Sequence, residues 1–376
     1  MADDDLVYDA LERLEWDDGK HADDPAKRLG RVTRRAALTG GAAGMAALAL
    51  QACAGGGGSA SASSGRSAAA GIFGTGQRYT FTFVNHATTN SFFTPARSGA
   101  ADACRLLGCS YEWTGSPTSN VSDMVNAIDS AVAQRRNGIA TTLIDPTAFN
   151  SPVAKALAAD IPVVAYNSDT AGNPRLAYIG QDLVLSGQMM GDRIASLISS
   201  GHVALFIATP GSLNLQPRIN GALETIKSRS SIAPHIVASG VVQAQELPLI
   251  KSFMTQHPTY KGFFAVDGGS TAAVAQAIEQ TGLARQGVKG GGFDLTPATE
   301  RLLSEGQIEF AIDQQPYLQG FFPILELYLY NATQKLTGIS DIDTGLKFLD
   351  KTTVRPYVTT KSRYEATSTG VGVHKA

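Results

Sequence analysis

Residues 138–170, GIATTLIDPTAFNSPVAKALAADIPVVAYNSDT, decide the fold class of this chain. Residues 139–144 and 161–165 are two short apolar runs rich in β-branched side chains. Such runs are typical of strands that are buried on both faces of a parallel sheet. Pro152 suits the first turn of a helix, where its missing N–H costs nothing, and residues 153–159 continue that helix. The stretch therefore predicts two parallel strands joined by a helix in a right-handed connection.

Polar residues stand at the end of both predicted strands. Asp145 follows the first strand, and Tyr166-Asn167-Ser168-Asp169 follows the second. In open α/β sheets, ligands bind beyond the carboxyl ends of the strands. The same stretch therefore predicts a fold and the position of a binding site.

The rest of the chain repeats this alternation of strands and helices twice, with a break near Asp182. A long helix is expected at residues 319–337, and the remaining strands at residues 78–85, 109–114, 176–179, 202–208, 235–242, 262–266, 288–293, 308–312 and 344–348. The pattern predicts an α/β protein with two doubly wound parallel-sheet lobes. We assign residues 78–183 plus 315–343 to the N-terminal lobe and residues 184–314 plus 344–365 to the C-terminal lobe. Several chain crossings between them would form a hinge that closes on a ligand.

Composition agrees with one large or two medium domains. The chain has 376 residues, of which 43% are hydrophobic and 17% are charged, and its formal net charge is -2. No basic surface for nucleic acid is evident, so no nucleic-acid partner is expected. Three cysteines do not make a disulfide framework. We expect Cys104 and Cys109 to be two buried thiols, with a disulfide as the alternative in an exported protein.

The first 76 residues are not expected to belong to the fold. Arg34-Arg35 precedes a weakly apolar run at residues 36–50, which is too short to span a membrane but suits an export signal of the twin-arginine type. Leu50-Gln51-Ala52-Cys53 resembles a lipobox, and the Gly/Ser/Ala-rich sequence after it suits a flexible tether. We assign residues 1–52 to the signal, residues 53–77 to the tether, and lipidation to Cys53. A plain secretory signal and a cytosolic tail are the alternatives.

Short motifs follow the predicted strands in a fixed order: NSFF at 90–93, IPVV at 161–164, RING at 218–221, FAVD at 264–267, GFD at 292–294 and DQQP at 313–316. In this order they resemble the motifs of the periplasmic sugar-binding proteins of ABC importers, the ribose/galactose-binding or type I periplasmic binding protein family. The resemblance covers about residues 78–354. It implies that a sugar or polyol binds between the lobes without being chemically changed.

The resemblance also implies which residues contact the ligand: Asn90, Phe92, Phe93, Asn167, Ser168, Arg218, Asp267, Asp294 and Gln314. These residue types suit a polyol, because carboxylates accept hydrogen bonds, arginine donates them in a planar fork, and amides do both. Aromatic rings cover the apolar C–H faces of a sugar ring. No catalytic residue, metal ligand or cofactor is predicted.

Structural roles remain as alternatives for these residues. Asp294, Asp267 and Asn90 suit helix caps or turns, Arg218 suits a helix surface, and the phenylalanines suit a core. Tyr166 and Asp145 also lie at these strand ends as candidates for ligand contact, and strand packing is the alternative for Tyr166. The chain also departs from the family's ribose binders, which carry Asp-Arg where this chain has Asn167-Ser168. Asp169 or Arg175 would have to compensate for the missing guanidinium.

The predicted function is that of a lipid-anchored, monomeric solute receptor that hands a sugar or polyol to an ABC permease. An extracellular sensor that signals ligand closure to a membrane receptor is the alternative. A sugar-responsive repressor is rejected, because the sequence before Arg78 is Gly/Ala/Ser-rich where a DNA-binding motif would stand. A dinucleotide-binding oxidoreductase does not fit either, since residues 85–90 lack the glycine-rich phosphate-binding turn.

Overall fold

The computed structural model describes residues 78–229 and 231–360. The predicted signal with Arg34-Arg35, the lipidation site Cys53 and the tether lie outside the described residues.

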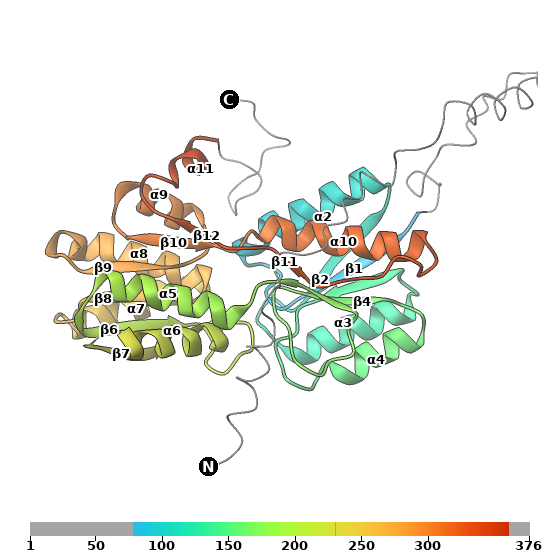
Figure 1. Cartoon of the computed structure of the whole chain (residues 1–376), viewed down its shortest axis with the longest axis horizontal. Helices are drawn as coiled ribbons and strands as arrows, with labels where there is room; N and C mark the ends of the chain where they lie inside the picture. Colours follow the sequence, from blue (N-terminus) through green and yellow to red (C-terminus); the bar gives the residue numbers. More distant parts are fainter. Residues whose placement is uncertain (1–77, 230, 361–376) are drawn as a thin grey trace, which may run out of the picture. The chain divides into compact units, whose positions relative to one another are not determined.

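Two six-stranded sheets organise this part of the chain, and each is the centre of one lobe (Figure 1). The first sheet has the order β11-β5-β4-β3-β1-β2, and the second has the order β12-β10-β9-β8-β6-β7. Neighbouring strands are parallel in both sheets except for β10 and β12, which pair antiparallel. The fold is therefore the predicted pair of doubly wound α/β lobes.

The first lobe contains β1 (Thr80–Asn85), α2 (Thr94–Leu107), β2 (Ser110–Gly115), α3 (Val121–Ala133), β3 (Gly138–Thr141), α4 (Asn150–Ala158), β4 (Val163–Tyr166), β5 (Ala177–Gly180), α10 (Pro316–Ala332) and β11 (Ile342–Asp343), with the 3-10 helix η2 (Ser91–Phe93) before α2. The period-two alternation of β1 decides which helices cover which face. Phe81 and Phe83 pack in a cluster with α2 and α10, whereas Val84 packs in a cluster with α3 and α4. Helices α2 and α10 lie side by side over one face (Figure 1).

The second lobe contains α5 (Leu183–Leu197), β6 (Ser200–Ile207), α6 (Gln216–Arg229), β7 (Ser231–Ala238), α7 (Gln243–Gln256), β8 (Gly262–Ala265), α8 (Gly268–Thr281), β9 (Lys289–Phe293), α9 (Pro297–Glu305), β10 (Phe310–Asp313), β12 (Lys347–Leu349) and α11 (Arg355–Thr360), with the 3-10 helix η3 (Leu283–Gln286) before β9. Strand β6 alternates in the same way. Val203, Leu205 and Ile207 pack with α5 and α6, whereas Ala204 and Phe206 pack with α7 and α8.

The chain passes from one lobe to the other three times: between β5 and α5, between β10 and α10, and between β11 and β12. Loops at the carboxyl ends of β1 and β4 in the first lobe, and of β6, β8 and β9 in the second, carry the polar residues discussed below. This connectivity positions the site, because one end of each parallel sheet gathers these loops.

Two predicted strands differ from the structure. The strand expected at residues 235–242 is β7, Ser231–Ala238, which includes Pro234. A proline is tolerated there because β7 is an edge strand, so its missing N–H breaks no ladder. The single strand expected at residues 344–348 is not present; β11 ends just before this range and β12 begins inside it, and the two belong to different sheets. Gly345, with φ 71°, lies in the turn between them. The long helix also begins earlier and ends earlier than expected, at Pro316 and Ala332.

Cys104 and Cys109 are free thiols in the structure. Cys104 is buried near the end of α2, and Cys109 is half-buried just before β2. Their sulfurs lie 2.9 Å apart across the turn at Gly108, whose φ of 73° is the left-handed conformation that glycine adopts without strain.

Candidate functional site: an interlobe cavity

A cavity of about 540 Å³ opens between the two lobes. This volume falls in the range of about 300–1,000 Å³ that small-molecule sites occupy. The first lobe contributes residues from the loops after β1, β2, β3 and β4, and the second contributes residues from the loops after β6 and β7 and from the ends of β8 and β9. Both walls are therefore built from the carboxyl ends of parallel strands.

Eight of the nine predicted ligand residues line this cavity: Asn90, Phe92, Phe93, Asn167, Arg218, Asp267, Asp294 and Gln314. The ninth, Ser168, lies elsewhere. It is fully buried, and its hydroxyl donates to the carbonyl oxygen of Leu143 at 2.6 Å. Ser168 thus links the end of β4 to the loop after β3. Because it does not line the cavity, we do not include it among the proposed ligand contacts.

The other strand-end residues have structural partners. Tyr166 is fully buried, and its hydroxyl accepts a hydrogen bond from the amide of Asn85 at 2.7 Å. Asp145 accepts from the backbone N–H groups of the following turn, which lowers its pKa. Arg175 binds Asp169 through two hydrogen bonds, and neither residue lines the cavity. They do not replace the guanidinium that the family's ribose binders carry where this chain has Asn167-Ser168, after β4.

Asn167 and Asp294 reach the cavity through an uncommon backbone conformation. Their φ angles are 64° and 74°, in the left-handed region that Asn and Asp tolerate better than other non-glycine residues. Each residue follows its strand directly, so the left-handed turn aims the short polar side chain past the strand end. Backbone strain of this kind is concentrated at functional sites.

Arg218, Gln314 and Asp294 form one buried hydrogen-bond chain. The side-chain oxygen of Gln314 accepts from Nη2 of Arg218 at 2.9 Å, and its amide nitrogen donates to Oδ1 of Asp294 at 2.7 Å. Nη1 of Arg218 donates to the carbonyl oxygen of Val266 at 2.8 Å, and the guanidinium lies 4.2 Å from the ring centre of Phe293. Gln314 stands at the second chain crossing, so this network joins the hinge to the cavity wall.

Burial governs the charge states of these groups. Burial raises the pKa of Asp294 to about 7, although the Arg218 charge and the hydrogen bond from Gln314 oppose the rise. Burial also raises the pKa of Asp267, against hydrogen bonds from the backbone of Ser270 and Ala208. Burial lowers the pKa of Arg218, whose ordinary value is high enough for the guanidinium to stay charged. A bound hydroxyl can therefore donate to the carboxyl groups and accept from Arg218.

The apolar part of the wall comes from η2. Asn90 caps this short helix by accepting from the backbone N–H of Phe92 at 2.9 Å. The rings of Phe92 and Phe93 meet edge to face, with 4.7 Å between their centres. Both rings are nearly buried, so they combine core packing with a surface that faces the cavity. Ligand contact and structural packing are compatible here.

Among the cavity residues that sequence reasoning missed, His86, Asn214 and Glu246 have polar side chains that matter for the arguments below. His86 follows β1 and Asn214 precedes α6, positions at strand ends that composition alone does not distinguish from loop residues. Burial lowers the pKa of His86 to about 4, and Arg218 adds to this effect, so its ring is neutral near pH 7. Glu246 lies in the first turn of α7, away from the strand ends on which the sequence-based prediction relied. The only available signal was an acidic residue between the strand β7 and the apolar residues at 247–250.

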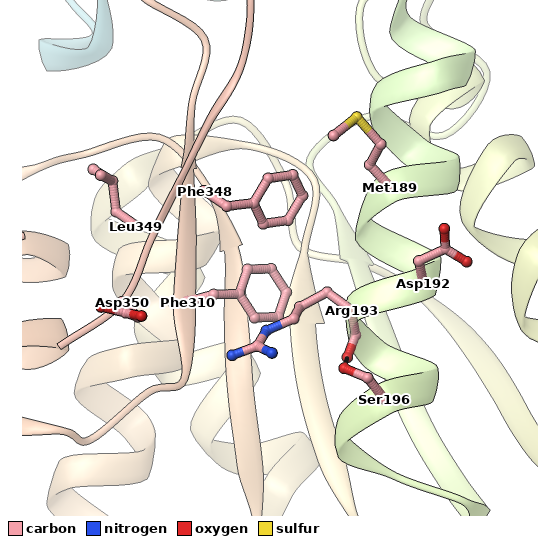
Figure 2. A pocket seen from close by; sticks show the side chains of 8 residues that line it. All are labelled: Met189, Asp192, Arg193, Ser196, Phe310, Phe348, Leu349 and Asp350. Atoms are coloured by element: carbon pink, nitrogen blue, oxygen red, sulfur yellow. Dashed lines mark hydrogen bonds between the residues drawn. The ribbon is translucent and has the colours of Figure 1, made fainter. Parts of the chain in front are cut away.

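A second hollow, of about 450 Å³, lies between α5 and the strands β10 and β12 (Figure 2). Met189, Asp192, Arg193 and Ser196 come from α5, Phe310 from β10, Phe348 and Leu349 from β12, and Asp350 directly follows β12. None of the predicted ligand residues lines it, and its charged side chains are half-buried or exposed. It belongs to the second lobe alone. The interlobe cavity is therefore the candidate site.

Within the described ranges, no group of three or more His, Cys, Asp or Glu side chains has the arrangement of a metal site. The helices of the same ranges include none with the length and hydropathy of a membrane span.

The family model described as the periplasmic binding protein domain matches residues 81–333. This chain belongs to the periplasmic binding protein family. A curated member, the xylose/arabinose-binding protein XylF of Sulfolobus acidocaldarius, is 45% identical over 306 residues, which cover 77% of this chain and 75% of that protein. The ribose import binding protein RbsB of Escherichia coli is 24% identical over 241 residues, which cover 63% of this chain and 79% of that protein.

Solved structures of periplasmic binding proteins share the fold. A carbohydrate transporter protein of Acidothermus cellulolyticus in complex with myo-inositol aligns with a TM-score of 0.67 and 27% identity, covering 75% of this chain and 98% of that one. A solute-binding protein of Burkholderia graminis in complex with D-arabinose aligns with a TM-score of 0.68 and 24% identity, covering 73% of this chain and 96% of that one. The predicted type I fold is confirmed, and the family is one of solute-binding proteins rather than enzymes.

Proposed function

We propose that this periplasmic binding protein is the receptor of an ABC importer, which holds a sugar or polyol in the interlobe cavity and delivers it to a membrane permease. The Arg218–Gln314–Asp294 chain supports this proposal most directly, because it presents a donor and acceptors to one buried cavity between two lobes. A sugar hydroxyl both donates and accepts, so it suits such a wall better than a purely apolar or purely anionic ligand does.

An aldopentose is the first ligand to test. The relative that is 45% identical to this chain is named for xylose and arabinose binding. The cavity has one side chain with a permanent positive charge, Arg218, among the residues that line it, and no other Arg or Lys. This composition favours a neutral polyol over a phosphorylated sugar, which would need several cationic partners.

The eight lining residues named above are the proposed ligand contacts. Polar contacts would come from Asn90, Asn167, Arg218, Asp267, Asp294 and Gln314, and ring contacts from Phe92 and Phe93. A site of this kind discriminates strongly against analogues that lack a hydroxyl, because its buried polar groups would be left unpaired. We therefore expect the protein to distinguish between sugars of the same size by the hydroxyl groups that they carry.

We further propose export through the signal at residues 1–52 and anchoring to the outer face of the cytoplasmic membrane through lipidated Cys53. The paired arginines, the short apolar run and the lipobox-like sequence support this proposal. Detergent partitioning of the protein expressed with its own signal tests it, with Cys53→Ala as the matched variant. Equal partitioning of both into the aqueous phase would reject the anchor.

Isothermal titration calorimetry of the purified protein against pentoses, hexoses and inositols tests the main proposal. We expect saturable one-to-one binding of at least one aldopentose and recovery of the unchanged sugar after the titration. Absence of heat and of a melting-temperature shift with every member of the panel would overturn it. Conversion of a sugar to a product would overturn it equally.

A further inference from the structure

Glu246 is a buried carboxyl group in the cavity wall for which the fold provides few partners. It lies in the first turn of α7, and 3% of its surface is exposed. Its Oε2 atom is buried and has no hydrogen-bond partner among the described residues. Leaving a buried acceptor without a partner is unfavourable, and such groups in native proteins are uncommon. The unpaired oxygen therefore calls for a partner that the chain itself does not supply.

The carboxyl group of Glu246 packs against the beginning of α8. The carboxyl group lies over Gly269 in the first turn of α8, where an added Cβ atom would come within 2.5 Å of Oε2. Asp267 is close enough to raise the pKa of Glu246 by its charge. Ser270, the next residue of α8, donates its backbone N–H to Asp267 instead. The absence of a side chain at Gly269 thus lets the carboxyl group lie against α8, and Glu246 is also among the residues that line the cavity.

We propose that Glu246 is a ligand-contacting residue, which accepts a hydrogen bond from one hydroxyl group of the bound polyol. It would thereby select for ligands that carry a hydroxyl at that position. The inference rests on the proposed function. Among the residues that line the cavity, Glu246 and Arg218 each carry a buried atom without a partner, Oε2 and Nε respectively. One is an acceptor and the other a donor, and a hydroxyl group can serve as the partner of either.

The protonation state of Glu246 agrees with a neutral hydroxyl as its partner. Burial, with the Asp267 charge adding to it, raises the pKa of Glu246 to about 8. Near pH 7 the carboxyl group is largely protonated, and it can then accept and donate as a hydroxyl does. An ammonium group would require the ionised form. The alternative is a structural role, in which the acidic side chain only favours the first turns of its own helix and of α8.

Binding of a hydroxyl-deletion series separates the two roles. The probe is the sugar of the calorimetry panel that the wild-type protein binds most tightly, with analogues that each lack one of its hydroxyl groups. We expect Glu246→Ala to bind the parent sugar at least tenfold more weakly than the wild-type protein does. For the one analogue that lacks the hydroxyl bound by Glu246, the affinities of the variant and the wild type should differ less than threefold. The wild-type protein should bind that same analogue at least tenfold more weakly than the parent. Gln245→Ala, an exposed position on the same helix, is the matched control and should bind as the wild type does.

Three results would overturn the inference. The first is unchanged binding of the parent sugar by Glu246→Ala, and the second is an equal loss for every analogue, which a structural role predicts. The third is a preference for an amino sugar over the parent. If the alanine variant does not fold, Glu246→Leu carries the same comparison with a side chain of similar size. Failure of the wild-type protein to bind any sugar would instead reject the proposed function, a result that does not depend on Glu246.

Discussion

Nε2 of His86 lies 3.3 Å from Nδ2 of Asn214, and this contact joins the two lobes at the wall of the cavity. Nδ1 of His86 lies 3.0 Å from the hydroxyl of Thr142. With the ring neutral, Nδ1 donates to Thr142 and Nε2 accepts from Asn214. The contact can exist only while the lobes are close together, because one residue follows β1 and the other precedes α6.

We expect removal of this contact to weaken ligand binding by favouring separated lobes. A hydrogen bond is worth about 0.5–1.5 kcal/mol, which corresponds to a two- to tenfold loss of affinity. Calorimetry on His86→Ala, Asn214→Ala and the double variant measures it, since residues that act through one contact give a non-additive cycle. Asn220→Ala, at an exposed position on α6, is the control. Strictly additive losses would show that the two residues act separately.

The Arg218–Gln314–Asp294 chain makes a second prediction about affinity. We expect Arg218→Ala and Asp294→Ala each to weaken sugar binding by about 2–4 kcal/mol, because each leaves buried polar partners unpaired. Arg301→Ala removes an exposed guanidinium that binds Glu279 and Glu305, and it should leave affinity unchanged. Wild-type affinity in both cavity variants would reject the cavity as the sugar site.

A third prediction concerns the packing of α5 against α6 behind Arg218. Gly187 of α5 approaches the backbone of Arg218 so closely that an added Cβ atom would come within 2.1 Å of its carbonyl oxygen. Gly187→Ala must therefore displace the helix that carries Arg218. We expect a loss of stability of about 1–3 kcal/mol, the usual cost of overpacking, together with weaker sugar binding.

Gly99→Ala is the matched control for this effect. Gly99 of α2 makes an equally close approach, 2.1 Å from the carbonyl oxygen of Tyr317, in the first lobe and away from Arg218. It should destabilise the protein to a similar degree while the folded fraction keeps its affinity. Thermal unfolding and calorimetry on both variants give the comparison. Equal affinity losses would show that general destabilisation, and not the position of Arg218, is responsible.

Much of the fold was predictable because buried parallel strands have a strong local signal. The β-branched runs at β3 and β4 and the glycines or prolines at helix ends mark element boundaries within a few residues. Strand β7 was misplaced because an edge strand carries polar residues and a proline, whereas the apolar Val241 and Val242 after it belong to a partly exposed loop. Residue type alone does not reveal which strand will be at the edge.

The site was predictable where a residue follows a strand within one or two positions. Asn167, Asp267 and Asp294 stand at strand ends, and parallel topology brings such positions together. Ser168 has a similar sequence signal, but it comes after the left-handed turn at Asn167 and its hydroxyl binds the carbonyl oxygen of Leu143 instead. His86, Asn214 and Glu246 depend on how two lobes and two helices approach each other. That approach is a property of the tertiary structure, and no local pattern encodes it.

The fourth prediction is that the ligand-free protein loses stability as the pH rises from about 6.5 to 8. Burial raises the pKa of Asp294 to about 7 and that of Glu246 to about 8, and it raises that of Glu326 to about 7 outside the cavity. A raised pKa means that the folded state holds the proton more tightly than the unfolded state does. The resulting stability is complete below the unfolded pKa of about 4 and is lost as the pH rises through the folded values.

His86 acts in the opposite direction, but in a lower pH range. Its pKa falls to about 4, so its contribution is lost only as the pH falls below about 6.5. Between pH 6.5 and 8 the carboxyl groups therefore dominate, and we expect the free energy of unfolding to fall by about 1 kcal/mol or more. Urea unfolding at several pH values measures this slope, and Asp294→Asn and Glu246→Gln should each flatten it. A stability that rises over this range would show that these carboxyl groups are already ionised in the folded state, as they would be if water or a cation reached them.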